Sequence, residues 1–401
     1  MNKFLRKFFV ALVIVFIFVQ VGFTANEEDA KLIKKILKDI QLTTRVKVEY
    51  DDNVFLVEDN EESVVKEVLS QSFLYRLIND KSFFRWNYTG QFAYYNDETT
   101  SVTSHSTGFM YSYRPLKKLA FGLQYDYNWL KDSKITSTIG DRVVDLGYHH
   151  HRPEVEIKYE IQPRTNIRVN AGVEDLDVTD ADSDDFIDNK KRTATLEVNH
   201  IFTDLDKLMG FAGMDFRQIT FPQISQKAST AYRPYIGISK TFSGIGIWRS
   251  EVGFDHINMD ELNSDDDNID FKLSFETIFS LYTKLRFSLN GNVKKSSLRS
   301  DYTQYAANIA KMNISHAVSQ KTSIFVDYSF EKQHFESSDF TIGSERIDRQ
   351  TYIQRLNLTL NHKLRKGLSV DYQYGYTKRD SDFAREGYTD NKFSIALTAR
   401  Y

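Results

Sequence analysis

The last ten residues, Lys392-Phe393-Ser394-Ile395-Ala396-Leu397-Thr398-Ala399-Arg400-Tyr401, alternate between two kinds of side chain. One side of the extended chain would carry Phe393, Ile395, Leu397, Ala399 and Tyr401, and the other side Lys392, Ser394, Thr398 and Arg400. A repeat of two residues is typical of a β-strand with one apolar and one polar face. This stretch therefore predicts a strand that meets two different environments.

The same alternation recurs from residue 41 to residue 401. It forms about eighteen segments of roughly 10–16 residues, which is the length that a tilted membrane strand with its overhang requires. The alternation weakens over residues 208–217 and 303–319, so a count of about sixteen strands stays open.

Short and long connections between these segments take turns along the chain. The short ones lie near residues 79–81, 114–117, 162–164, 203–207, 243–246, 281–283, 319–321 and 365–367. The long ones, rich in Asp, lie near residues 57–63, 97–101, 132–145, 175–189, 220–226, 259–267, 336–346 and 379–386. This order predicts an all-β fold, a transmembrane antiparallel up-and-down barrel with short periplasmic turns and long extracellular loops.

The composition agrees with a barrel and excludes several function classes. Only 5 Pro residues interrupt the chain, which suits a sheet whose backbone donors are all used. With 0 Cys there are no disulfides, thiol nucleophiles or Cys-based metal sites, and a net charge of -3 gives no basis for binding nucleic acid. The mean hydropathy of -0.46 resembles that of a soluble protein because only every second strand residue would face lipid. No cofactor is expected.

The N-terminus has the pattern of a secretory signal. Lys3, Arg6 and Lys7 precede an apolar run over residues 8–21, and small residues follow near Ala25. The run of about 14–16 apolar residues is short for a helix that needs roughly 20 to cross a bilayer, so we predict a signal peptide over residues 1–25 rather than a retained anchor.

A short amphipathic segment follows the predicted signal. Leu32, Ile33, Ile36 and Leu37 recur at helical spacing, which predicts a periplasmic helix over residues 26–40 before a barrel over residues 41–401. The helix would plug the barrel or dock a periplasmic partner, or it would lie against the barrel rim as a simple stub. The sequence leaves these alternatives open.

The polar face of the strands predicts the lining of a water-filled lumen. The predicted lining residues are Arg85, Asn87, Gln91, Glu156, Lys158, Arg286, Asn290, Arg355, Asn357, Asn361, Asp371 and Gln373. Barrels of 16–18 strands are wide enough for an aqueous channel. We therefore predict a channel for polar solutes, with sugars well suited to the mixed charges and amides. The competing interpretation is that these side chains only bridge one another across the lumen.

Two clusters raise the question of metal binding. Asp180, Asp182 and Asp184 have the spacing of a calcium loop, but Asp185 stands where such loops need Gly and Lys191 where they need Glu. A solvated loop, bridged by divalent ions to lipopolysaccharide, explains the same residues. His149 and His151 would share a strand face, yet no third ligand has suitable spacing.

No catalytic constellation stands out, because His200, His256 and His316 lie in predicted strands without a Ser-containing elbow nearby. We therefore expect no enzymatic activity. A non-transporting surface or adhesion barrel, which would bind a partner through its acidic loops, remains the alternative to a channel.

The end of the first predicted strand, Glu49-Tyr50-Asp51-Asp52-Asn53-Val54-Phe55, resembles the opening of the β-barrel porin 2 family of Gram-negative outer-membrane proteins. The motif residues are Glu49, Asp52, Asn53 and Phe55, and the rest of the chain agrees only in length, strand rhythm and terminal strand. The resemblance implies location in the outer membrane and an association with exopolysaccharide synthesis and export.

The terminal strand carries the expected signal for barrel assembly. Phe393, Ile395, Leu397 and Tyr401 give the apolar alternation and aromatic end that the barrel-assembly machinery recognises in outer-membrane barrels, although Tyr401 stands where Phe is more common. The expected partners are therefore this machinery, outer-membrane lipid and lipopolysaccharide, together with a polysaccharide or small polar solute.

Overall fold

The computed structural model describes residues 40–53, 56, 63–95, 101–139, 142–179, 188–203, 207–222, 228–242, 245–259, 264–296, 304–335, 348–383 and 386–401. The predicted signal peptide, the predicted helix up to residue 39, Phe55, and the calcium candidates Asp180, Asp182 and Asp184 lie outside the described residues. Within the described part of the chain, no helix is long and apolar enough to cross a membrane.

The chain forms eighteen strands. The first nine are β1 (Ile40–Asp51), β2 (Val64–Ile78), β3 (Ser82–Tyr95), β4 (Ser101–Leu116), β5 (Leu119–Ile139), β6 (Arg142–Gln162), β7 (Thr165–Val178), β8 (Asn189–Ile201) and β9 (Met209–Thr220). The others are β10 (Ser229–Phe242), β11 (Gly246–Met259), β12 (Ser264–Ser280), β13 (Thr283–Ser296), β14 (Gln304–Ala317), β15 (Thr322–Phe335), β16 (Arg349–Arg365), β17 (Leu368–Ser381) and β18 (Tyr388–Arg400).

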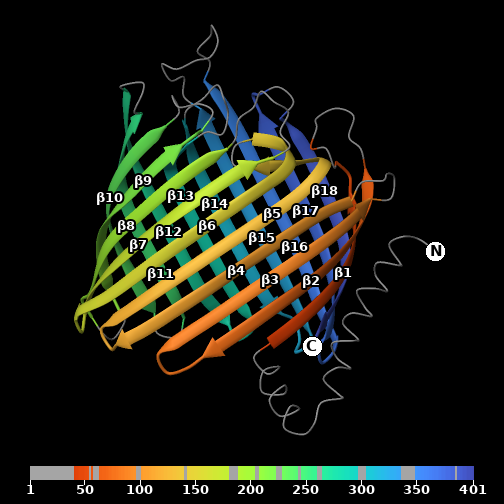
Figure 1. Ribbon diagram of the computed structural model, residues 1–401, viewed down its shortest axis with the longest axis horizontal. Coiled ribbons are helices and arrows are strands. Elements are labelled where there is room, and N and C mark those ends of the chain that lie inside the picture. The colour runs from red at the N-terminus through yellow and green to blue at the C-terminus, as the bar shows by residue number, and fades with distance from the viewer. Residues whose placement is uncertain are drawn as a thin grey trace.

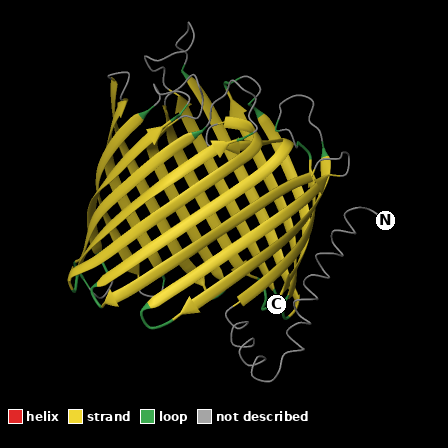
Figure 2. Ribbon diagram, viewed as in Figure 1, coloured by secondary structure: helices red, strands yellow, loops and turns green. Residues whose placement is uncertain are grey.

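The sheet closes on itself. Each strand pairs antiparallel with the next, and β1 pairs with both β2 and β18. The β1–β18 register runs from Thr43 opposite Arg400 to Asp51 opposite Lys392. Figures 1 and 2 show the result, a tilted barrel whose short turns gather at the end where the C-terminus lies. The predicted closed, antiparallel barrel of about eighteen strands is confirmed.

The two faces of the sheet differ sharply in character. On β18, Phe393 and Ile395 are 52% and 55% exposed, whereas Ser394 and Ala396 are 7% and 1% exposed. Since directly paired residues of neighbouring strands point to the same side, the strand register carries this assignment around the whole barrel. Exposed outward residues on other strands include Val48, Leu123, Val155, Leu196, Val252, Phe271, Leu358 and Tyr372.

One predicted loop is wrong, and a second, over residues 259–267, is shorter than expected because β12 begins at Ser264. Residues 132–145 were expected to form a long connection, but β5 continues to Ile139 and β6 begins at Arg142, with Thr136 opposite Asp145. The hairpin therefore extends as a two-stranded ribbon beyond its neighbours. The scattered Asp residues favoured a loop, but the β-branched residues between them, such as Ile135 and Val143, favour extended strands.

The two stretches of weak alternation are both strands. Residues 208–217 belong largely to β9, and residues 303–319 largely to β14. Their alternation is blurred because apolar residues also face inward there: Phe211 is 3% exposed, Ala307 0% and Ile309 8%. A strand that is apolar on both faces loses the period of two on which the prediction depends.

Candidate functional site

The twelve predicted lining residues all lie on the inward face of the barrel. Starting from buried Thr398, the register places Arg45, then Ser70, then Gln91 on the same side. The same rule places the rest inside: Arg85, Asn87, Glu156, Lys158, Arg286, Asn290, Arg355, Asn357, Asn361, Asp371 and Gln373. Their role as the lining of a solute path is a separate question and stays a prediction.

A buried ion-pair network centres on Arg233 of β10. Its guanidinium donates to Asp270 from Nε at 2.9 Å, to Asp215 from Nη1 at 3.0 Å and to Glu251 from Nη2 at 2.7 Å. The Arg233 and Asp270 side chains are 8% and 3% exposed. The three carboxylates come from β9, β11 and β12, so one cation joins four adjacent strands.

The network extends along the same wall. Glu251 also accepts from Lys272 Nζ at 3.1 Å. Next to it, Glu197 of β8 accepts from Arg249 Nη2 and from the Tyr235 hydroxyl, each at 3.1 Å. On this wall the inward charges bridge one another, as the competing interpretation of the sequence expected. No motif or spacing in the sequence singles out any of these residues.

Glycines let these long side chains lie flat against the wall. A Cβ added at Gly253 would stand 2.5 Å from the Arg233 guanidinium, and one at Gly213 would stand 2.5 Å from the Tyr235 ring. Both glycines occupy inward positions of the sheet. Any larger residue there would push the arginine or the tyrosine toward the barrel axis, so the glycines keep the interior wide.

A cavity of about 350 Å³ borders the network. Its lining includes side chains of both signs from β6 to β12, among them Glu174, Lys191, Arg217, Asp255 and Lys272. A space of this size with donors and acceptors on every side suits a hydroxylated or charged solute rather than an apolar one.

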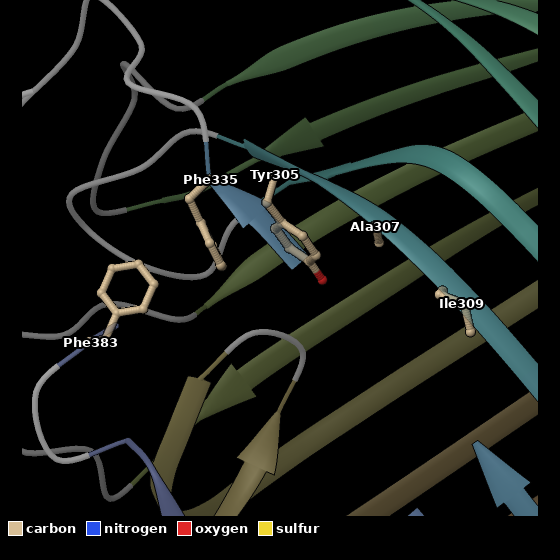
Figure 3. Close-up of a cluster of buried hydrophobic side chains, with 5 residues drawn as sticks. All are labelled: Tyr305, Ala307, Ile309, Phe335 and Phe383. Carbon is tan, nitrogen blue, oxygen red and sulfur yellow. The ribbon is translucent and has the colours of Figure 1, made fainter. Parts of the chain in front are cut away.

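An apolar cluster lies inside the barrel near the long loops. Tyr305, Ala307 and Ile309 of β14 meet Phe335 at the end of β15 and Phe383 after β17, as Figure 3 shows. The Phe335 ring stacks on Tyr305 and meets Phe383 edge-on, each with centroids 5.0 Å apart. These rings are 0–3% exposed, so this part of the mouth is filled rather than open.

Hydrogen bonds fasten the segment that carries Phe383. The Gln350 backbone N–H donates to Asp382 Oδ2 at 2.7 Å, and the Asp382 N–H donates to the Gln350 carbonyl at 3.0 Å. Arg379, which is 1% exposed, donates to Glu386 at 2.8 Å. Asp382 is thus fastened to the start of β16, and Glu386 to Arg379 of β17.

The family-motif residues Asp52 and Asn53 join the first strand to the last. The Asn391 backbone N–H donates to Asp52 Oδ1 at 2.5 Å, and Asn391 Nδ2 donates to Asp52 Oδ2 at 2.7 Å. Asn53 Nδ2 donates to the Thr389 carbonyl at 2.9 Å. These bonds close the β1–β18 seam at its long-loop end, where the two ends of the sheet must meet.

Charged residues support the same seam from inside. Glu49, the first motif residue, is 7% exposed and pairs with Lys47 and, at 2.7 Å, with Lys66. Lys392 bridges Asp51 and Asp390 at 2.9 and 3.1 Å. Asp51, Asp52 and Asp390 lie close enough to share a cation, but Lys392 already pairs with Asp51 and Asp390, and Asp52 accepts from Asn391.

Replacing Asp52 by alanine is expected to destabilise the barrel by about 2 kcal/mol, because a charged acceptor of two hydrogen bonds is lost and Asn391 loses its partner. Urea unfolding of the refolded protein in detergent would measure the difference. Asp80→Ala is the matched control, since Asp80 lies in an exposed turn without a side-chain partner among the described residues. Equal stability of the two variants would contradict a role of Asp52 in closing the seam.

The histidines predicted to share a face do so, on the outside of the barrel. His149 Nδ1 and the Tyr127 hydroxyl are 2.9 Å apart, as are His151 Nδ1 and the Tyr125 hydroxyl. Each ring thus has a tyrosine partner on β5. His150 points inward and lies 3.1 Å from Glu174. The arrangement is that of an aromatic and histidine patch, and it does not gather a third ligand among the described residues.

Comparisons with known proteins find similarity among solved structures alone. No family model matches the sequence. No curated protein matches it either. Among solved structures, a ferric enterobactin receptor of Pseudomonas aeruginosa is similar, with 8% identity, a TM-score of 0.49, and coverage of 90% of this chain and 80% of the receptor. A BenF-like porin of Pseudomonas fluorescens has 9% identity, a TM-score of 0.47, and coverage of 91% and 100%. Likeness of this degree carries no argument about function.

Proposed function

We propose that this protein spans the outer membrane of a Gram-negative bacterium and forms a channel for polar solutes. The observation that carries the proposal is the inverted distribution of side chains. Ile395 and Phe393 stand exposed on the outside, whereas Arg85, Asn357 and Gln373 face the interior. Closed barrels are the β-structures that lipid tolerates, because they leave no unpaired backbone edge.

Physical chemistry favours lipid outside and water inside. Exposing apolar surface to water costs about 25 cal/mol per Å², so a continuous outer band of Val, Ile, Leu and Phe would destabilise a dissolved barrel. The inward charges need water or one another, and eighteen strands enclose a lumen wide enough for water. The cavity beside the Arg233 network supports the passage of solutes that form hydrogen bonds.

The same proposal implies a route and partners. A signal peptide over residues 1–25 would direct export, and the terminal strand with Phe393, Ile395, Leu397 and Tyr401 would be recognised by the barrel-assembly machinery. Outer-membrane lipid would surround the barrel, with lipopolysaccharide at the long-loop end. The two ends of the barrel then correspond to the periplasm, at the short turns, and the cell exterior, at the long loops.

A narrower role in polysaccharide export rests on the motif from Glu49 to Phe55 alone. Two of its residues, Asp52 and Asn53, make seam contacts, and contacts of that kind would serve any barrel that must close. The resemblance therefore supports an export role without defining a polysaccharide site. Our proposal does not include an enzymatic activity, because the sequence offers no catalytic constellation.

Planar-bilayer recording of the refolded protein tests the channel. Stepwise current is the expected result, because the interior is polar and wide. Current should persist when residues 26–39, which precede β1, are deleted, and it should increase if that segment acts as a plug rather than as a stub at the rim. Silence of both the full mature chain and the deletion variant would overturn the proposal.

The apolar cluster at Phe335 and Phe383 favours a second candidate, a surface barrel with a closed mouth that binds a partner through its acidic loops. The variant Phe383→Ala separates the two. For a channel partly narrowed by Phe383, conductance should rise above that of wild type, because an aromatic ring held at the mouth is removed. The control Phe393→Ala removes an outward ring of equal size and should leave conductance unchanged. A closed surface barrel would carry no current as wild type, as Phe383→Ala or as Phe393→Ala.

A further inference from the structure

Uncompensated positive charge gathers inside the barrel at its short-turn end. Six inward side chains lie at this end: Arg76, Arg85, Lys158, Lys284 and Lys363 within a few residues of a short turn, and Arg400 at the end of β18. None of the six has an ion-pair or side-chain hydrogen-bond partner among the residues that the structure describes. Arg76 even stands directly opposite Arg85 on the neighbouring strand.

Carboxylates are scarce on this part of the wall and most are occupied. Glu276 pairs with Arg286 at 2.7 Å, and Glu197 with Arg249 at 3.1 Å. Asp371 accepts from the Asn361 amide and lies 3.7 Å from Arg45, and Asp327 accepts from the neutral Asn313 amide. Within the described strands, Glu160 is the inward carboxylate near a short turn that has no such partner. The short-turn end is therefore positive inside, with few anions of its own.

In the half of the interior nearer the long loops, positive and negative side chains are more evenly matched. Nearer the long loops, Lys66 pairs with Glu49 at 2.7 Å and Lys295 with Glu331 at 2.8 Å. Arg233 is shared among three carboxylates. Charges there neutralise one another, so the field that a solute meets changes along the barrel axis.

Like charges placed opposite each other destabilise a sheet. Arg76 and Arg85, which face each other without a carboxylate partner among the described residues, therefore do not stabilise the fold by their charges. Low-dielectric walls concentrate the field of such charges in the lumen. Screening limits the reach of each charge to about 8–10 Å at physiological salt, so these cations act on ions that pass close to the wall of the lumen. Neutral sugars gain nothing from this field, whereas carboxylates do.

We infer that the short-turn end of the lumen selects anions, and that its solutes are carboxylate-bearing, such as acidic saccharides. This inference deepens the proposed channel and rests on it. Anions would be drawn into the barrel from the short-turn side and would then pass the charge-balanced half, where hydroxyl groups exchange hydrogen bonds with the ion-pair network.

Reversal potentials across a tenfold KCl gradient test the selectivity. The wild-type channel should pass chloride at least twofold better than potassium. The double variant Arg76→Gln/Arg85→Gln should lose at least half of that preference. The control Lys117→Gln/Lys118→Gln removes the same charge from a turn outside the strands and should shift the ratio less. A wild-type preference for potassium, or no change in the double variant, would overturn the inference.

A binding assay keeps the inference testable if no current is seen. Trigalacturonate should bind the refolded wild-type protein in detergent at low salt. Its affinity for Arg76→Gln/Arg85→Gln should be at least fivefold lower, whereas neutral maltotriose should bind both proteins equally. Absence of current together with this pattern would refute the channel and retain the anion site. Equal trigalacturonate binding by wild type and variant, in proteins with the same urea midpoint, would refute the anion site itself.

Discussion

Replacing Arg233 by alanine is expected to destabilise the barrel by about 3–5 kcal/mol. The substitution removes the cation that Asp215, Glu251 and Asp270 share. Asp270 and Glu251 are 3% and 7% exposed, so their charges would be left buried with fewer partners. Urea unfolding of the refolded protein, followed by tryptophan fluorescence, would measure the loss, and Trp248 on the adjacent strand β11 offers a local probe.

Arg286→Ala is the matched control for this prediction. Arg286 also faces inward and also pairs with a carboxylate, Glu276, at 2.7 Å, but the two side chains are 62% and 49% exposed. Exposed pairs contribute about 0–1 kcal/mol, so this variant should be nearly as stable as wild type. Similar losses for the two variants would show that burial of the Arg233 network does not matter.

Placing a charge on the outer surface should be almost as damaging. Leu358 lies near the middle of β16, points outward and is 37% exposed. Arginine on the lipid face near the bilayer midplane costs about 2–4 kcal/mol. Leu358→Arg is therefore expected to lower the free energy of unfolding by that amount when the protein is refolded into lipid vesicles.

Asn357→Arg places the same side chain one residue earlier in the chain, on the inward face. Water in the lumen would solvate the new arginine, so the unfolding free energy of the Asn357→Arg protein should stay within about 1 kcal/mol of wild type. The comparison tests which face meets lipid. If Asn357→Arg proved the more damaging variant, the assignment of faces would be reversed and the proposed membrane location would fail.

The fold could be predicted from local pattern because each strand carries its own signature. The alternation on β18 and β5 needs no knowledge of the neighbours, and the turns at residues 117–118 and 366–367 fall where the sequence placed short connections. Prediction weakened at β9 and β14, where Phe211, Ala307 and Ile309 face inward. It failed between residues 132 and 145, where strand propensity prevailed over acidic composition.

The interior was predicted less completely. Alternation alone placed the lining residues on the inward face, but nothing in the sequence near Arg233 indicated a network. Its inward neighbours on the strand, Ala231 and Tyr235, are apolar or aromatic, so the strand looked like a poor candidate for the lining. The carboxylates that bind Arg233 are 18 and 37 residues away along the chain, beyond the reach of any spacing rule.

Local sequence pattern is enough to predict a closed sheet of about eighteen strands with opposite faces, because a period of two is present in each single strand. The folded barrel is needed to show which inward charges are neutralised, that Asp52 and Asn53 hold the seam, and that Phe335 and Phe383 fill part of the mouth. Those features depend on strand register and closure, which bring together residues as far apart as Asp52 and Asn391. Electrostatic pairing and packing act between neighbours in space, and only the folded barrel defines those neighbours.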